Sequence, residues 1–380
     1  MPIISPRFRL RRSRKGRSAF APRGAVIDRL SELDRARSDP GNLRARCYVP
    51  AGLEGPAPLV VVLHGCTQDA ALYNHGSGWS TLADRHGFLL LFPEQRRANN
   101  PMLCFNWFES GDTRRGKGEA ASIAAMIEAM SSAHAVDPAR ISVTGLSAGG
   151  AMASAMLAVY PELFAAGAIL AGVAYGCADG VDEAFACMGG RTRSDAKELA
   201  ARVRSASPHQ GPWPRVQVWQ GSDDSTVVPS NADAIVLQWA GLHGLGLEPD
   251  RIDRVAGYPR RLWLDAAGEP LIEQYSITGM AHGVPIAADG GEDDLGQAGA
   301  HMLDVGLSST ARIAAFFGIA PDPETGAAGE AKVAARPAAQ AGPPQHPEQA
   351  SGPQAVIEKA LRAAGLMPQG RAIPPRRGGS

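Results

Sequence analysis

Between residues 42 and 320, short apolar runs alternate with longer segments whose apolar positions recur at helical spacing. The runs Leu59-Val-Val-Val-Leu63 and Phe88-Leu-Leu-Leu-Phe92 are continuous, which is typical of strands buried on both faces. Further strands are expected at 44–49, 140–144, 166–173, 216–220 and 272–277. Helices are expected at 120–130, 149–160, 231–242 and 308–317. Strands separated by helices predict an α/β fold, with a mostly parallel sheet covered on both faces.

The two ends of the chain differ in composition from this region. Residues 1–24 contain eight Lys and Arg residues and no acidic residue. More than half of residues 321–380 are Ala, Gly or Pro, and only 356–367 has the apolar spacing of a short helix. We therefore expect a flexible basic arm over 1–40, a folded domain over 41–320 and a disordered tail over 321–380.

Composition excludes several classes of protein. The chain has 380 residues, 44% of them hydrophobic, which is enough for a sizeable core. No apolar run approaches the roughly 18 residues that a membrane-spanning helix needs. Lys plus Arg equals Asp plus Glu, 38 of each, and this balance argues against a nucleic-acid-binding protein. The basic N-terminus is not followed by the apolar stretch of a secretory signal peptide.

The five cysteines do not predict a zinc site, because no CxxC pair is present. Their number is odd, so at least one is unpaired within a monomer. Cysteine usage alone leaves the redox compartment open.

The segment Gly145-Leu-Ser147-Ala-Gly149 matches G-x-S-x-G and joins a predicted strand to a predicted helix. A serine at such a strand–turn–helix junction is typical of a nucleophile elbow, where only tiny neighbours fit. The helix N-terminus then lies near the developing negative charge. A glycine-rich turn without catalytic role is the alternative in a chain with 44 glycines. The surrounding strand and helix favour Ser147 as nucleophile.

A serine nucleophile requires a histidine base that is oriented by a carboxylate. Asp223 and Asp224 follow the predicted strand 216–220, and the pattern leaves the choice between them open. A carboxylate there could instead cap the next helix. His282 follows the strand 272–277 in a loop with a glycine on each side, so it is the expected base. Three other histidines fit the order less well and are interpreted as ordinary residues: His209, His243 and His301.

The oxyanion hole is expected from the loop after the strand 59–63. There, Gly65 permits close backbone approach, and the N–H of Cys66 would act together with the N–H of Ala148. We interpret His64 as a structural residue of this turn rather than a base or a metal ligand.

Seven motifs, in order, resemble the esterase, poly(3-hydroxybutyrate) depolymerase family of α/β-hydrolases, which includes feruloyl-esterase-like members. They are YVPA at 48–51, LVVVLHGCTQ at 59–68, CFNWF at 104–108, GLSAGG at 145–150, AYGC at 174–177, GSDDSTV at 221–227 and GMAH at 279–282. They extend over about residues 41–318. The resemblance implies an α/β-hydrolase fold and a serine carboxylic-ester hydrolase that acts through an acyl-enzyme, without metal or cofactor.

The resemblance also implies roles for single residues. The family spacing G-x-x-D-x-x-V places the acid at Asp224. The cysteine of the HGC loop pairs with that of CFNWF, which implies a Cys66–Cys104 disulfide; in a cytosolic protein we would favour two free thiols. Cys177 with Cys187 is a second possible pair, which leaves Cys47 single. The chain departs from the family at Gln220, where members usually have histidine.

The sequence leaves alternatives for the substrate and for the location of the protein. Trp79, Trp107 and Phe108 lie near the expected active-site mouth, and we assign Trp107 and Phe108 to an apolar acyl cleft; aromatics in this fold are equally often core residues. The tail is too short for a polymer-binding domain, so a small soluble ester is as plausible as a poly- or oligo(3-hydroxybutyrate) substrate. The alternatives are a feruloyl or acetylxylan esterase, and a non-catalytic protein of a polymer or granule surface. The resemblance favours an extracellular protein, and the missing signal segment favours the cytoplasm.

Overall fold

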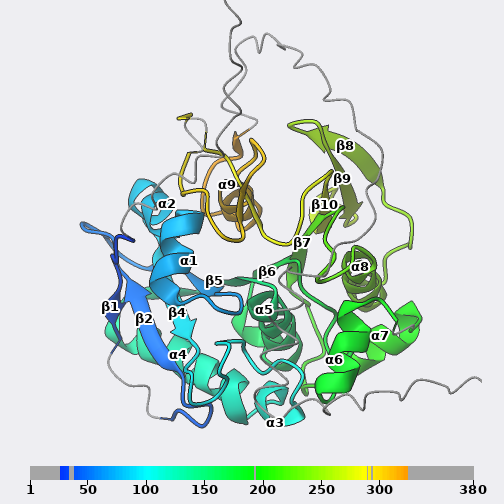
Figure 1. The fold of residues 1–380 in the computed structure, drawn as a ribbon, viewed down its shortest axis with the longest axis horizontal. Coiled ribbons are helices and arrows are strands. Elements are labelled where there is room, and N and C mark those ends of the chain that lie inside the picture. The colour runs from blue at the N-terminus through cyan, green and yellow to red at the C-terminus, as the bar shows by residue number, and fades with distance from the viewer. Residues whose placement is uncertain (1–25, 34–37, 192–193, 289, 292–293, 324–380) are drawn as a thin grey trace, which may run out of the picture.

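The computed structural model describes residues 26–33, 38–191, 194–288, 290–291 and 294–323, and these form an α/β fold around one large sheet (Figure 1). Ten strands follow one another across it in the order β1-β2-β4-β3-β5-β6-β7-β10-β9-β8. The strands from β4 to β10 in this order are parallel. The outer strands on both sides pair antiparallel.

Strands and helices alternate over most of this region. The strands are β1 Ser31–Glu32, β2 Arg44–Tyr48, β3 Ala57–Leu63, β4 Leu89–Glu94, β5 Val136–Leu146, β6 Ala166–Leu170, β7 Arg215–Gly221, β8 Arg251–Val255, β9 Tyr258–Leu264, β10 Pro270–Ile277, β11 Val284–Ile286 and β12 Met302–Asp304. The helices are α1 Ala70–Ser77, α2 Trp79–His86, α3 Ser110–Thr113, α4 Gly118–Ala133, α5 Ala148–Val159, α6 Val181–Met188, α7 Ala196–Arg204, α8 Ser230–His243 and α9 Ser309–Phe316, with a 3-10 turn η1 at Pro161–Leu163. Strands β11 and β12 form a separate parallel pair.

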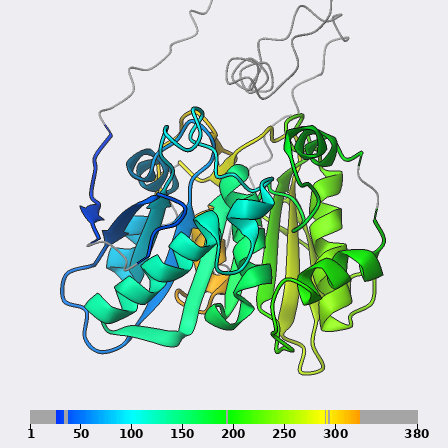
Figure 2. The same ribbon diagram turned by 90° about the horizontal axis from the view of Figure 1, so that it is seen from below.

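Helices cover both faces of the sheet (Figure 2). Helices α4, α5, α7 and α8 pack on one face, and α1, α2 and α9 pack on the other. Leu59, Val61 and Leu63 of β3 belong to the first core cluster, whereas Val60 and Val62 belong to the second. Side chains of a strand alternate between faces, so a strand that is apolar throughout needs an apolar layer on each side. The predicted α/β fold is confirmed.

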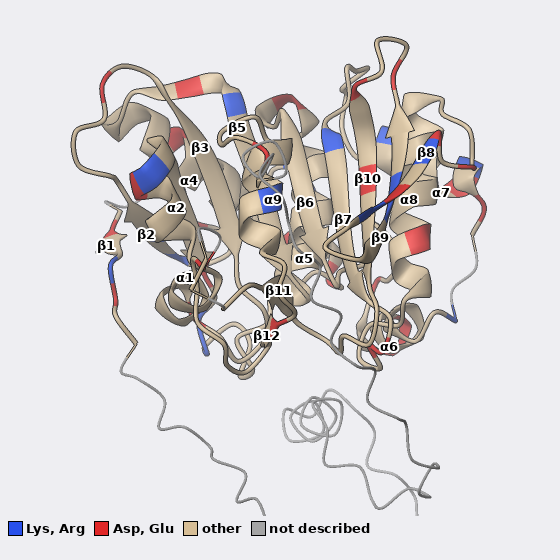
Figure 3. Cartoon of the chain, turned by 90° about the horizontal axis from the view of Figure 1, so that it is seen from above, with Lys and Arg blue, Asp and Glu red and all other residues tan. Residues whose placement is uncertain are grey.

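Three elements around Ser147 are free of charged residues. Strands β3 and β6 and helix α5 contain no Asp, Glu, Lys or Arg and are entirely tan in Figure 3. All twelve residues of α5 are buried. Ser147, between β5 and α5, is therefore held between two elements that pack tightly in the core.

One edge of the sheet differs from the sequence expectation, which placed no strand between 242 and 272. Strands β8 and β9 form an antiparallel hairpin there, and β9 continues the sheet from β10. Arg260 pairs with Asp253 across the hairpin, with Nε to Oδ1 at 2.8 Å. This edge is half exposed and carries several charged side chains, so it lacks the continuous apolar run that marks the central strands.

The structure also differs from the flexible arm predicted over residues 1–40, because some of these residues pair with the sheet. Ser31 and Glu32 pair with Cys47 and Arg46 of β2. The buried Arg46 guanidinium contacts the Asp28 carboxylate at 3.0 Å, so residues around Asp28 neutralise a charge on the sheet. Residues 1–25 of the predicted arm, the predicted tail from 324 and its short helix at 356–367 lie outside the described residues.

C-terminal truncation tests which residues after α9 are needed for stability and for activity. Asp322 Oδ1 contacts Arg312 Nη1 at 2.8 Å, and Arg312 is largely buried in α9. Truncation after Ala320 removes this carboxylate, so we expect a stability loss of about 1–3 kcal/mol. Truncation after Pro323 keeps the contact, and kcat/KM on a soluble p-nitrophenyl ester should stay within about twofold. A tenfold loss with an unchanged melting temperature would mean that residues beyond 323 act at the active site.

Candidate active site

Ser147 lies on a sharp turn between β5 and α5. Its φ is 57° and its ψ is −116°, a left-handed φ that residues with a side chain rarely adopt. The Ser147 N–H donates to Leu170 O at 2.9 Å, and Ser147 O accepts from Ala151 N at 2.8 Å. The turn is thus held by the neighbouring strand β6 and by the first turn of α5, as a nucleophile elbow requires.

The glycines around Ser147 are required by packing. A Cβ on Gly145 would lie 2.4 Å from the carbonyl carbon of Gly149. A Cβ on Gly149 would lie 2.3 Å from Leu63 O and 2.5 Å from His64 O. Strand β3, the elbow and α5 therefore approach one another at backbone distance, and this brings the loop after β3 beside Ser147.

Asp224 and His282 form a direct hydrogen bond. His282 Nδ1 lies 2.7 Å from Asp224 Oδ2, and the Asp224 side chain is fully buried. The other carboxylate oxygen, Oδ1, accepts from the backbone N–H groups of Thr226 and Val227, each at 2.9 Å. An Nδ1–H that donates to Asp224 leaves His282 Nε2 free to accept a proton.

Asp223 and Asp224 have different surroundings. The Asp223 side chain is exposed, and its Oδ1 accepts a hydrogen bond from Ser222 Oγ at 2.9 Å. Gln220, the departure from the family pattern, is buried and donates to Asp224 Oδ2 at 3.0 Å and to Val227 O at 3.0 Å. Gln220 is thus a further contact of this carboxylate that the motif did not reveal.

The loop of His282 is fixed from two sides. Asp223 N donates to Met280 O at 3.0 Å, which joins the loops after β7 and β10. His301 Nδ1 donates to His282 O at 3.2 Å, so His301 supports this loop.

Ser147 Oγ makes no hydrogen bond within the described part of the chain. In enzymes without substrate, the contact from nucleophile to base is often long and tightens on binding.

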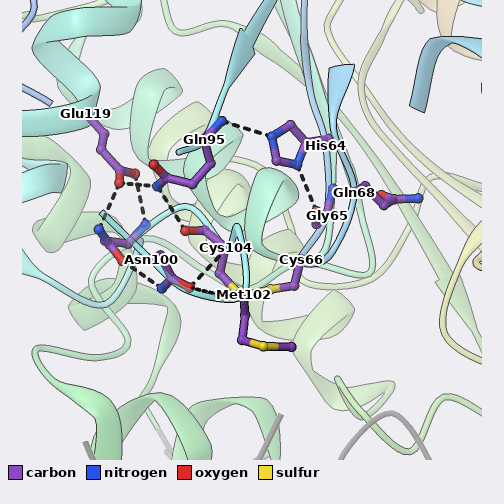
Figure 4. The surroundings of a disulfide bond; sticks show 10 residues. His64, Gly65, Cys66, Gln68, Gln95, Asn100, Met102, Cys104 and Glu119 are labelled. Carbon is purple, nitrogen blue, oxygen red and sulfur yellow. Dashed lines mark hydrogen bonds between the residues drawn. A yellow bond between two sulfur atoms is a disulfide. The ribbon is translucent and has the colours of Figure 1, made fainter. Parts of the chain in front are cut away.

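The loop after β3 is linked to the CFNWF segment. Cys66 and Cys104 form a disulfide (Figure 4). In addition, Thr67 N donates to Met102 O at 2.6 Å. Within the described residues, the N–H groups of Cys66 and Ala148 have no hydrogen-bond partner. Two free N–H groups beside a nucleophile are what an oxyanion hole requires.

A cavity of about 60 Å³ adjoins Ser147. Cys66, Ala148, Trp107 and Phe108 all line it. The rings of Trp107 and Phe108 meet edge to face, with centroids 5.5 Å apart. Trp79, which we expected near the same mouth, is instead a core residue 1% exposed, because α2 packs its side chain against Phe88 on the other face of the sheet.

Helix α6 forms a wall of the cavity that was not predicted. Four of its residues line the cavity, Val181, Ala184, Phe185 and Met188. The last three follow Val181 by three, four and seven residues, which is the spacing of one helix face. This apolar face of α6 was therefore detectable in the sequence. A second disulfide, between Cys177 and Cys187, ties α6 to the preceding loop, and Cys47 is free and buried.

Three other histidines that the sequence analysis considered form hydrogen bonds with backbone carbonyl groups: His64, His209 and His243. His64 is buried, and burial lowers the pKa of its imidazole. His209 Nε2 donates to Pro212 O at 2.8 Å, and His243 Nε2 donates to Pro214 O at 3.1 Å. The described residues contain no group of three His, Cys, Asp or Glu side chains that could hold a metal ion, and none of their helices is long and apolar enough to cross a membrane.

Loss of the Cys66–Cys104 disulfide should affect both stability and turnover. For Cys104→Ala we expect a stability loss of about 3–4 kcal/mol, from the closed loop of 38 residues. We also expect a kcat loss of about tenfold, because Cys66 loses its covalent tether. Thermal unfolding and ester hydrolysis measure the two effects. Cys47→Ala removes a buried thiol without a cross-link, and kcat there should be unchanged; equal losses in both variants would contradict the prediction.

Comparisons with known proteins agree with this geometry. The family model for esterase PHB depolymerase matches residues 43–257, more than half of the chain. Poly(3-hydroxyalkanoate) depolymerase C of Paucimonas lemoignei is 44% identical over 291 residues, 76% of this chain and 70% of that protein. An acetylxylan esterase of Coprinopsis cinerea is 32% identical over 263 residues, 67% of this chain and 69% of that protein. The solved acetyl xylan esterase from Aspergillus awamori matches with TM-score 0.65 and 26% identity over 77% of this chain and 99% of that one.

These findings confirm the family, the fold and the esterase activity that the sequence motifs predicted. The roles of individual residues remain predictions, although the structure brings Asp224 to His282, and Cys66 and Ala148 to one cavity with Ser147. The chain is a carboxylic-ester hydrolase and belongs to the esterase, PHB depolymerase family of α/β-hydrolases.

Proposed function

We propose that Ser147, His282 and Asp224 are the catalytic triad of this ester hydrolase. The observation that carries this proposal is the 2.7 Å contact between His282 Nδ1 and Asp224 Oδ2, on loops that follow parallel strands of the same sheet as the Ser147 elbow. The carboxyl ends of parallel strands lie at one edge, so the three loops converge there.

The reaction follows from these positions. His282 Nε2 accepts the hydroxyl proton of Ser147 as Oγ attacks the ester carbonyl, and the developing oxyanion accepts hydrogen bonds from the N–H groups of Cys66 and Ala148. His282 then gives the proton to the leaving alkoxide. Water, activated by the same imidazole, hydrolyses the acyl-enzyme. Asp224 holds the imidazole tautomer and stabilises its charged form.

The acyl group is proposed to be short, such as the 3-hydroxybutyryl unit of a hydroxyalkanoate ester. The cavity of about 60 Å³ holds on the order of five water-sized groups. Beyond its carbonyl, a 3-hydroxybutyryl unit has only a methylene, a methine, a methyl and a hydroxyl. The apolar lining, with Trp107, Phe108 and Phe185, suits such a chain. Poly(3-hydroxyalkanoate) depolymerase C, a relative 44% identical, supports this substrate class.

Acetyl ester hydrolysis is the second candidate, because an acetyl group is smaller still and two of the relatives are acetylxylan esterases. A feruloyl group, with its substituted ring, fits a cavity of about 60 Å³ less well than either short acyl group. The two disulfides support an oxidising compartment outside the cytoplasm, where such bonds persist.

A substrate panel tests the proposal. The enzyme is assayed on 3-hydroxybutyrate oligomers, a polyhydroxybutyrate emulsion, acetylated xylan and methyl ferulate. We expect the highest kcat/KM on hydroxybutyrate oligomers and the lowest on methyl ferulate. Faster hydrolysis of methyl ferulate would contradict the short acyl pocket. Polymer binding without hydrolysis of any ester would favour a non-catalytic surface protein.

A further inference from the structure

Glu119 is a buried carboxyl group that the proposed mechanism does not use. It lies in the first turn of α4, is 1% exposed and is not part of the cavity lining described above. Its Oε1 accepts from Gln95 Nε2 at 2.5 Å and from Asn106 Nδ2 at 2.9 Å, and its Oε2 accepts from Asn106 N at 2.9 Å. Burial, and then the nearby Asp112, raise the pKa of Glu119 to about 8.

A first path of hydrogen bonds leads from Glu119 through two asparagines. Asn106, held by Glu119, accepts at Oδ1 from Asn100 Nδ2 at 3.0 Å. Asn100 Oδ1 accepts from the backbone N–H groups of Met102 at 2.9 Å and Cys104 at 3.4 Å. The backbone of the segment 100–106 is thus folded around side chains that Glu119 anchors.

This segment contacts the oxyanion loop, residues 64–68, at two points. Cys104 is bonded to Cys66 (Figure 4), and Met102 O accepts from Thr67 N. Cys66 provides one of the two N–H groups proposed for the oxyanion hole. A displacement of Cys104 or Met102 therefore moves that N–H.

A second path runs through Gln95. Its Nε2 donates to Cys104 O at 2.9 Å as well as to Glu119. Its backbone N–H donates to His64 Nε2 at 3.1 Å, so the His64 proton is on Nδ1, which donates to Gly65 O at 2.8 Å (Figure 4). The second path thus reaches the oxyanion loop at its first residue, His64.

We propose that Glu119 is a positioning residue for the oxyanion hole, whose carboxyl group orients Gln95 and Asn106 so that both paths hold the Cys66 N–H toward the reacting carbonyl. The inference rests on the proposed function, in which that N–H stabilises the oxyanion. Glu119 itself does not touch substrate. It acts at a distance, because each link in the two paths is a hydrogen bond or a covalent bond.

Glu119→Gln is the decisive variant. The side chain keeps its shape, but its NH₂ group faces a donor in either orientation, since both oxygens of the Glu119 side chain accept hydrogen bonds in the native protein. We expect kcat on p-nitrophenyl butyrate to fall about 10- to 100-fold, with KM within about twofold, because the oxyanion forms only in the transition state. The inhibition constant of butylboronic acid, which forms a tetrahedral adduct on serine, should rise by the same factor.

Two further variants separate positioning from general damage to the fold. Glu273→Gln is a matched control: Glu273 is buried on β10 and accepts a single hydrogen bond from Gln217 Nε2 at 2.8 Å. Its kcat and its butylboronic acid inhibition constant should stay within about twofold of the native values. Glu119→Asp keeps the carboxyl group but shortens its reach. This variant replaces Glu119→Gln in the test if the Glu119→Gln protein does not fold. For it we expect a kcat loss of about three- to tenfold with a parallel loss of boronic acid affinity.

The outcomes are distinct. If native protein hydrolyses the ester and binds butylboronic acid, but the folded Glu119 variant matches it in both, Glu119 is only a core residue and this inference is wrong. A loss of thermal stability alone, with unchanged kcat and boronic acid affinity, has the same meaning. If native protein neither hydrolyses the ester nor binds butylboronic acid, the proposed function fails first and this inference fails with it.

Discussion

Ser147→Ala should give a folded protein without measurable esterase activity. The nucleophile is lost, and loss of a triad serine typically costs on the order of 10⁶ in turnover. The fold should tolerate the change, because within the described residues the Ser147 hydroxyl makes no hydrogen bond that would be lost. Alanine also keeps the Cβ that the turn with φ of 57° already accommodates.

The measurement is kcat on p-nitrophenyl butyrate together with the melting temperature. Ser132→Ala is the matched control, because Ser132 lies exposed on α4 and its hydroxyl contacts only Glu128 O. This control should keep native activity. A Ser147→Ala protein with near-native turnover would place the nucleophile elsewhere.

Asp224→Asn should reduce kcat by about 10⁴, whereas Asp223→Asn should leave it within about twofold. An asparagine at 224 no longer presents an anion to His282 Nδ1, 2.7 Å away in the native protein, so the imidazole loses its orientation and its compensating charge. The loss is aggravated because Thr226 N, Val227 N and Gln220 Nε2 also donate to this carboxylate, and an amide nitrogen would face one of them.

Both variants are compared with native protein at the same pH and substrate concentrations. Asp223 is exposed and contacts Ser222, so its change tests only the loss of a nearby charge. The greater loss in the Asp223→Asn protein would mean that the acid was assigned to the wrong neighbour.

The central sheet was predictable because its signals are local. Strand β3 and residues 89–92 of β4 are continuous apolar runs, and α5 consists of small and apolar residues without charge. Burial on both faces demands such composition at every position. The β8–β9 hairpin was not predicted, because the edge of the sheet tolerates charged residues such as Arg260, which pairs with Asp253 on the neighbouring strand.

The sequence by itself determined the order of the candidate catalytic residues along the chain: a serine on an elbow, then an acid, then a histidine, each in the loop after a strand. Each candidate is recognisable because the features that mark it, a preceding strand and nearby glycines, lie within a few residues of it in the chain. The tertiary structure decided which groups each of these residues contacts. It alone joins His282 to Asp224, places Gln220 on that carboxylate, makes α6 a cavity wall and connects Glu119 to the loop of Cys66. The physical reason is that hydrogen bonds and cavities form between segments far apart in the chain, and their geometry depends on how strands register and helices pack.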